Sequence, residues 1–392
     1  MQEHPILGRL WIGHSPLLDR QRRPVATRLT VYPSTPEAAV DATALLAVLA
    51  EAWPPDPASG RPALLLNLAS EPLLRALIAS GGAYRPLLEL PAFIAAGAAL
   101  TEPLAAYAAA GGMLVLRGGT PSSLPAALRG SIGQLIVDAP AGVPAAGGPP
   151  CIVAGDGTLF ALDAAFKRGA SAVLGWPFAD LPPPVRGRTM PPDVQAVVEL
   201  IDCVRREEPV DRLEAVLKKD ATLAFRLLRY LNSPAFGLTV EIGSMRHAVL
   251  LLGYQRLGRW LGVLLASASP DPDLRPVLYA AIRRGLFFEE LLRGSDDPEM
   301  RGELFLCGVF SLLDRMLRLP FDALLKMVPV PTRVHEALVD GSGPFQPYLE
   351  LARAIESESL FDIRETAERL LLGPAEVNRA LLQTLVVARD VG

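Results

Sequence analysis

The first 180 residues contain a regular series of short apolar runs, and this series limits the fold more than any other feature. Each run has several consecutive apolar residues, and Ala-rich segments that favour helix follow some of them. Short unbroken apolar runs are typical of parallel strands that are covered on both faces. The runs are ALLLNL (63–68), LLEL (87–90), MLVLRG (113–118), QLIVDA (134–139), CIVAG (151–155) and AVLGWP (172–177).

Two further segments near the start, RLWIGHSPLL and ATRLTVYP, also have the character of strands. Together with the six runs they provide about enough strands for a closed barrel of βα units. Typical barrels of this kind have about 250 residues, so the loops here must be short. We therefore predict a degenerate TIM-like (β/α) barrel over residues 1–180.

The second half of the chain has a different periodicity. A Pro-rich stretch at 181–193 separates it from the first half, because proline continues neither a helix nor a central strand. From Val194 onward apolar residues recur with the helical period, and no strand pattern returns. The predicted fold class is α/β plus all-α, with a barrel at 1–180, a linker at 181–193 and a helical domain at 194–392.

Composition excludes several classes of protein. The formal net charge of −4 argues against a broad nucleic-acid surface, which needs dense Lys and Arg. The three cysteines, Cys151, Cys203 and Cys307, are widely spaced, which favours buried free thiols over a zinc or disulfide site. We see neither a signal peptide nor an apolar run of the ~20 residues that a membrane span needs. We expect a cytoplasmic protein without a membrane segment.

One motif in the second half is unusually specific. The segment KKDATLAFRLLRYLNSPAFGL is followed by IGSMRHAVLLLGYQRLGRWL. This pattern resembles the HDOD domain, a helical relative of HD-type phosphohydrolases that lacks their metal ligands. The resemblance covers about residues 190–375 and singles out Asp220, Arg229, Asn232, Ser233, Ser244 and Gly253 as a structural motif.

Local chemistry agrees with a structural role for this motif. Asn232 and Ser233 have no neighbouring His, so we interpret the NSPAFGL elbow as a turn that fixes the angle between two helices. Ser244 is a candidate helix N-cap and Gly253 a candidate helix end. None of the four His residues is followed by Asp, so a metal site of the HD type is not predicted.

The first half resembles an EAL domain, the barrel that hydrolyses cyclic di-GMP, in a degenerate form. The resemblance begins with PLLDRQRRPVATRLTVYP, which is similar to the opening strand-turn-strand of that family. Where an EAL domain has its naming Glu, this chain has Arg28. Asn67, Glu89 and Asp138 match polar positions of the family, but Arg117 and Gly118 stand where it has paired Asp residues. The substrate-holding Arg of the family is replaced by Tyr32.

These replacements bear on the chemistry that the resemblance implies. An EAL barrel needs a carboxylate cluster that holds two metal ions. A guanidinium donates but accepts nothing, and its charge repels a divalent cation. We therefore predict no metal, no cofactor and no catalytic residue. Two alternatives remain for the arginines: Arg28 pairs with Glu89 or Asp138 as a structural ion pair, or Arg28 or Arg117 binds a phosphate.

The sequence thus favours a non-enzymatic bacterial signal-transduction protein, in which the HDOD domain binds other signalling or regulatory proteins. A metal-independent receptor for cyclic di-GMP is the first alternative, with weak binding of the nucleotide. A residual cyclic di-GMP phosphodiesterase is the second. The sequence leaves open the identity of the partner and whether the chain forms a homo-oligomer.

Overall fold

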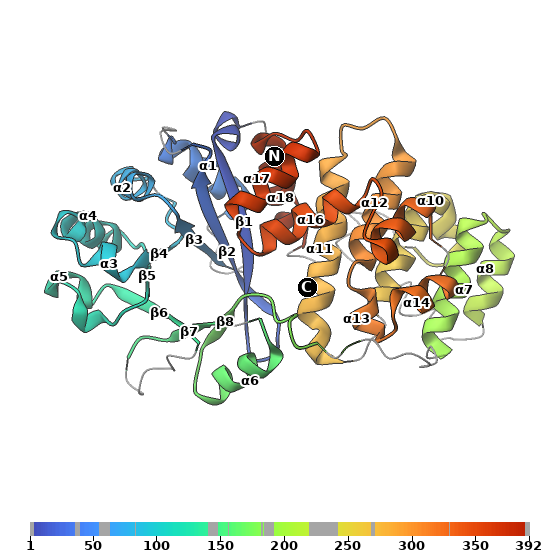
Figure 1. The fold of residues 1–392 in the computed structure, drawn as a ribbon, viewed down its shortest axis with the longest axis horizontal. Coiled ribbons are helices and arrows are strands. Elements are labelled where there is room, and N and C mark those ends of the chain that lie inside the picture. The colour runs from blue at the N-terminus through green and yellow to red at the C-terminus, as the bar shows by residue number, and fades with distance from the viewer. Residues whose placement is uncertain are drawn as a thin grey trace. The chain divides into compact units, whose positions relative to one another are not determined.

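The structure is a computed structural model. It describes residues 4–35, 40–54, 63–82, 84–139, 148–155, 157–181, 183, 192–218, 242–267, 271–328 and 330–388. The chain divides into two compact units (Figure 1). One comprises Met1–Leu181 together with Glu350–Val386, and the other comprises Pro182–Leu349 with Val387–Gly392.

The first unit is built on a closed barrel of eight strands in sequence order. All eight predicted strand segments are present, with small changes at their ends. β1 and β2 form an antiparallel hairpin, and β1 also pairs antiparallel with β8, whereas β2 to β8 pair in parallel. The strands are β1 (Leu10–Leu18), β2 (Pro24–Pro33), β3 (Ala63–Leu68), β4 (Leu87–Pro91), β5 (Leu114–Arg117), β6 (Ile132–Asp138), β7 (Cys151–Ala154) and β8 (Ala172–Leu174).

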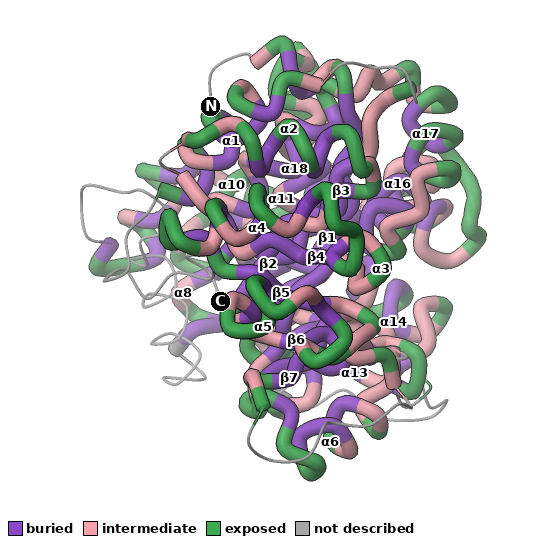
Figure 2. The backbone as a smooth tube through the Cα atoms, turned by 90° about the vertical axis from the view of Figure 1, so that its left-hand side faces the viewer, coloured by how far each residue is buried: buried purple, intermediate pink, exposed green. Residues whose placement is uncertain are grey.

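Helices lie between most of the parallel strands, and local sequence explains where several of them begin. The side chains of Asp41, Ser70 and Thr158 accept hydrogen bonds from the first backbone N–H groups of α1, α2 and α6. Figure 2 shows that the strands are largely buried, while α4 and α5 keep exposed residues. The helices are α1 (Ala42–Ala52), α2 (Glu71–Ala79), α3 (Ala92–Ala95), α4 (Ala98–Ala109), α5 (Ala126–Arg129) and α6 (Leu159–Lys167).

The barrel interior has an apolar layer to which nearly every strand contributes. We call it the apolar layer. Its members have at most 8% exposure, and Leu87 packs against them, so the barrel interior is filled at this layer. The buried members are Leu17, Ala26, Leu65, Val115, Ile136, Ile152, Ala172 and Leu174.

The C-terminal part of the chain differs from the sequence prediction, which placed all of 194–392 in one helical domain. The division between the units falls inside α16 (Gln346–Glu356), and α17 (Leu360–Arg369) contacts β1. In α18 (Pro374–Ala388) the buried amide of Asn378 donates to the carbonyls of Leu7 and Leu10, at 2.8 and 2.7 Å. Helical periodicity shows that a helix buries one face, but not what covers that face.

The second unit is helical throughout its described residues. Its centre is the pair α11 and α12, which approach closely where Gly285 meets Gly308: a Cβ on Gly308 would lie 2.5 Å from the backbone N of Gly285. Cys307 and Phe305 of α12 are buried and belong to the core of this unit. The helices are α7 (Pro192–Arg205), α8 (Val210–Lys218), α10 (Met245–Ala266), α11 (Arg275–Leu291), α12 (Pro298–Phe310), α13 (Leu313–Leu317), α14 (Phe321–Met327) and α15 (Thr332–His335).

All three cysteines are free and buried, as predicted. Burial raises the pKa of the Cys151 and Cys203 thiols above the ordinary value, which disfavours the reactive thiolate form. Among the helices that the structure describes, none combines the length and the apolar character that crossing a bilayer requires.

Candidate functional site

The five barrel residues singled out by the sequence lie in one layer. In a strand, residues two apart point to the same face. Each of the five follows a residue of the apolar layer, or Leu87 beside it, by two positions. They therefore form the next layer of the interior, toward the carboxyl ends of the parallel strands. We call Arg28, Asn67, Glu89, Arg117 and Asp138 the polar ring.

Ion pairs join four members of the ring. The guanidinium of Arg28 donates two hydrogen bonds to the Glu89 carboxylate, at 2.6 and 2.9 Å. Arg117 donates to the same carboxylate at 3.2 Å and to Asp138 at 3.0 Å. Arg28 is 4% exposed and Glu89 2%, so their pair is buried. The structural ion pair that the sequence left open between Arg28 and Glu89 is present.

A residue that no sequence motif indicates completes the ring. Glu358 lies in the turn between α16 and α17, and its carboxylate accepts a hydrogen bond from the second side of the Arg28 guanidinium. The same carboxylate accepts from the hydroxyls of Ser15 at 2.5 Å and Thr30 at 3.0 Å. Asn67 joins through Thr30, to whose hydroxyl its amide donates at 3.2 Å.

The electrostatics of Arg28 follow from this double contact. Burial alone opposes the charged form and lowers the pKa of the guanidinium. The hydrogen bonds and negative charges of Glu89 and Glu358 act in the opposite direction and prevail, so the pKa of Arg28 lies above its ordinary value. Arg28 is therefore a fixed positive charge between two carboxylates.

Tyr32 has a role that the sequence did not indicate. It occupies the position of the substrate-holding Arg in the EAL resemblance, and its hydroxyl donates to the backbone carbonyl of Glu358 at 2.7 Å. Burial, and after it the charge of Glu358, raises the pKa of Tyr32. No local sequence signal marks Glu358 as the partner, because it is one of many acidic residues and lies 330 positions from Arg28.

The donor set of the ring does not fit a metal ion. Both oxygens of Glu89 already accept from guanidinium groups, and Asp138 accepts from Arg117. Within the described part of the chain, no three His, Cys, Asp or Glu side chains are grouped so that they could hold an ion. The neighbouring guanidiniums therefore already pair with these carboxylates, and their positive charge repels a cation at the same place.

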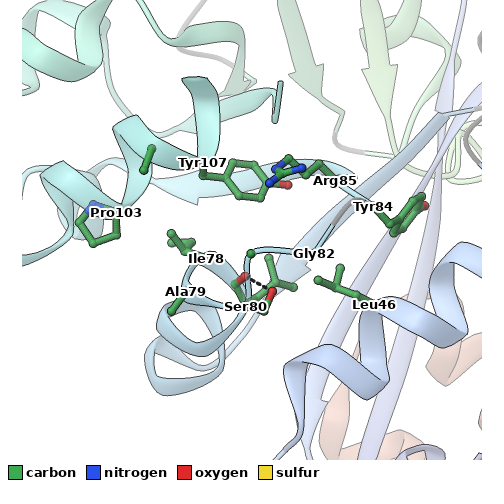
Figure 3. Close-up of a pocket in the computed structure, with 12 residues that line it drawn as sticks. Leu46, Ile78, Ala79, Ser80, Gly82, Tyr84, Arg85, Pro103 and Tyr107 are labelled. Carbon is green, nitrogen blue, oxygen red and sulfur yellow. Dashed lines mark hydrogen bonds between the residues drawn. The ribbon is translucent and has the colours of Figure 1, made fainter. Parts of the chain in front are cut away.

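A hollow of about 400 Å³ lies apart from the ring, among residues of α1, α2, α4 and the loop after α2 (Figure 3). Its walls are mostly apolar, and Arg85 and Tyr107 add polar groups. The Tyr107 hydroxyl donates to the Pro86 carbonyl at 2.8 Å, and burial raises its pKa to about 12. The hollow includes no member of the polar ring, so it does not bear on the predicted site.

In the helical unit, two of the six predicted motif residues are described. The Ser244 hydroxyl accepts from the backbone N–H of His247 at 3.1 Å, so Ser244 is the N-cap of α10. Gly253 has a φ of 73° and interrupts that helix, in agreement with its predicted role as a helix end. Asp220, Arg229, Asn232 and Ser233 lie outside the described residues.

Comparison with known families and proteins adds to this picture. Residues 190–316 match the HDOD domain. This range begins just before α7 and includes Ser244, Gly253, α11 and α12, so the match covers most of the helical unit. No solved structure matches the chain.

Two curated bacterial proteins are distant homologues. The uncharacterized protein YuxH of Bacillus subtilis is 25% identical over 210 residues, which are 53% of this chain and 51% of YuxH. The cyclic di-GMP phosphodiesterase CdgJ of Vibrio cholerae is 24% identical over 216 residues, which are 55% of this chain and 50% of CdgJ. The chain therefore spans about half the length of the curated relatives that it matches.

Proposed function

We propose that this chain is a non-catalytic signalling protein, in which an inactive, EAL-like (β/α) barrel is joined to an HDOD domain that binds other proteins. The observation that carries the first part is the position of Arg28. Its buried guanidinium lies between the carboxylates of Glu89 and Glu358. A barrel that cleaves a phosphodiester with metal ions needs free carboxylates at this layer.

The magnitudes favour inactivity. Two unit charges 4 Å apart interact by about 4 kcal/mol at an effective dielectric constant of about 20. A divalent cation beside Arg28 and Arg117 would meet repulsion of at least this order. To coordinate Glu89 or Glu358, the cation would also have to displace the guanidinium of Arg28, which already pairs with both carboxylates.

The catalytic part is tested by titrating the purified full-length chain with cyclic di-GMP in a calorimeter, with magnesium, with manganese and with a chelator. The products are then separated by chromatography, and CdgJ serves as the active control. We expect neither heat nor linear dinucleotide from this chain. Metal-dependent product would overturn the proposal, and metal-independent binding without product would replace it with a nucleotide receptor.

The adaptor part is supported by the HDOD match and by two exposed apolar side chains within it. Leu250 is 78% exposed and Leu251 43%, both on α10. Interaction surfaces often include contiguous exposed apolar groups, and these two neighbouring leucines are where we propose to test for one. Leu371, which is 91% exposed and outside the matched range, provides a matched control.

The corresponding experiment captures partners from a bacterial cytoplasm with the full-length chain as bait and identifies them by mass spectrometry. A variant with Leu250→Glu and Leu251→Glu is expected to lose partners that the Leu371→Glu variant retains. If both variants and the unchanged chain capture the same proteins as the empty resin, the adaptor role has lost its support.

A further inference from the structure

The turn that carries Glu358 has a backbone conformation that its sequence does not favour. Glu358 has a φ of 55°, in the left-handed region where Gly is the usual residue. The turn follows the common helix ending, since the N–H of Glu358 donates to Ile355 and that of Ser359 to Ala354, both at 3.2 Å. A non-Gly residue in this conformation costs about 1 kcal/mol, so other contacts must hold it there.

The Glu358 carboxylate is held by hydrogen bonds from three side chains, as a bound carboxylate ligand would be. One carboxylate oxygen of Glu358 accepts from Ser15, and the other accepts from Thr30 and Arg28. Two hydroxyl donors and one guanidinium satisfy a carboxylate well, because an ionised carboxylate only accepts. The donors come from β1 and β2, and the Glu358 side chain keeps 16% exposure.

The backbone of the turn is also fitted to the barrel. Gly13 of β1 lies against it: a Cβ at this position would be 2.9 Å from the Cα of Glu358. Tyr32 donates to the Glu358 carbonyl from the other strand of the hairpin. The barrel thus contacts the carboxylate, the Cα and the carbonyl of one residue.

We propose that Arg28 of the polar ring, with Ser15 and Thr30, forms a carboxylate-binding site whose resident ligand is the chain's own Glu358. In this arrangement the turn between α16 and α17 closes the barrel interior and keeps other anions from Arg28. The inference concerns the same site as the proposed function, but it does not depend on whether the barrel binds or cleaves a nucleotide.

The contrasting explanation is an ordinary ion pair that only anchors the C-terminal segment. The two explanations differ in what a free carboxylate does after Glu358 is shortened. A binding site keeps its donors in place and accepts acetate or formate in the hole that is left. An ordinary pair relaxes, and added carboxylate then acts no differently from chloride.

The experiment measures thermal unfolding of full-length Glu358→Ala in acetate, formate, phosphate or chloride at equal ionic strength and pH. Acetate and formate are expected to raise the midpoint of Glu358→Ala by about a few degrees, with saturation, because they bind only the folded state. Wild type and Glu358→Gln, whose site stays filled, are expected to show no such rise. Glu350→Ala removes an exposed ion pair with Arg369 in the same segment and is the matched control.

Each outcome decides the matter. Equal midpoints of Glu358→Ala in acetate and chloride overturn the proposal, as does an equal rise in Glu350→Ala. A larger rise in phosphate than in acetate overturns the assignment to carboxylates. If the Ala variant does not fold, Glu358→Gly serves, because Gly suits the positive φ. No nucleotide is present, so the result is independent of the test of catalysis.

Discussion

The two layers of the barrel interior share several strands, but their chemistry is opposite. The apolar layer consists of Leu, Ile, Val and Ala from almost every strand. The polar ring, two residues further along, has arginines, acids and an amide, and it is completed by Glu358 of the C-terminal segment. The apolar layer is complete within the barrel, whereas the ring needs a residue from a distant part of the sequence.

This difference has an energetic consequence. An apolar core is tolerant, because a replacement of similar volume changes its packing only slightly. A buried ion pair is intolerant of losing one partner, because the remaining charge stays buried without compensation. We therefore expect the ring to add little net stability as a whole, but to favour one arrangement of its members and so to specify where the Glu358 turn docks.

The largest expected loss of stability comes from Arg28→Met in the polar ring, and Leu65→Met in the apolar layer is its matched control. Arg28→Met leaves Glu89 without its main partner, and we expect the free energy of unfolding of the barrel to fall by about 3–5 kcal/mol. Leu65→Met, in the apolar layer, is expected to cost less than about 1.5 kcal/mol. Hydrogen exchange of the backbone amides in β3 and β4 measures the loss of barrel stability in both variants. A local probe is needed because a chain of two units need not unfold in one step. Equal losses would mean that the layers do not differ energetically.

A smaller effect is expected where the turn meets β1. Gly13→Ala places a Cβ against the backbone of Glu358, and we expect a loss of about 1–3 kcal/mol with faster hydrogen exchange in α17. Gly8→Ala is the matched control, since its Cβ would lie 3.8 Å from that of Ala375, an ordinary contact. Unchanged exchange in α17 of Gly13→Ala would show that the turn is not held against β1.

The two layers also differ in how far the sequence predicts them. Short apolar runs predicted six strands, and two further segments predicted β1 and β2. The resemblance to a known family singled out the five polar positions, which the structure brings into one layer. The contribution of Glu358 could not be predicted. Its left-handed conformation is rare for Glu, and an acid after an amphipathic helix gives no sign of where it docks. The assignment of α17 and α18 to the barrel unit was missed for the same reason.

The smallest effect is a titration that reports whether Glu358 is charged beside the ring. Burial and the Glu358 charge raise the pKa of Tyr32, so the stability this residue contributes is present below pH about 10 and falls as pH rises further. Glu358→Gln removes the charge, and we expect the pKa of Tyr32 to move down toward its ordinary value. The measurement is an ultraviolet titration of tyrosinate, with and without Tyr32→Phe, in both backgrounds.

The seven tyrosines of the chain make a control necessary. Tyr348 provides it, because burial alone raises its pKa and no carboxylate contributes. The titration of Tyr348 is obtained by subtracting the curve of Tyr348→Phe from that of the unchanged chain. It should be the same with Glu or Gln at position 358. A Tyr32 signal that also stays unchanged would mean that the Glu358 carboxylate is not held at the ring in solution. The polar ring would then lack Glu358, whereas the apolar layer would be unaffected.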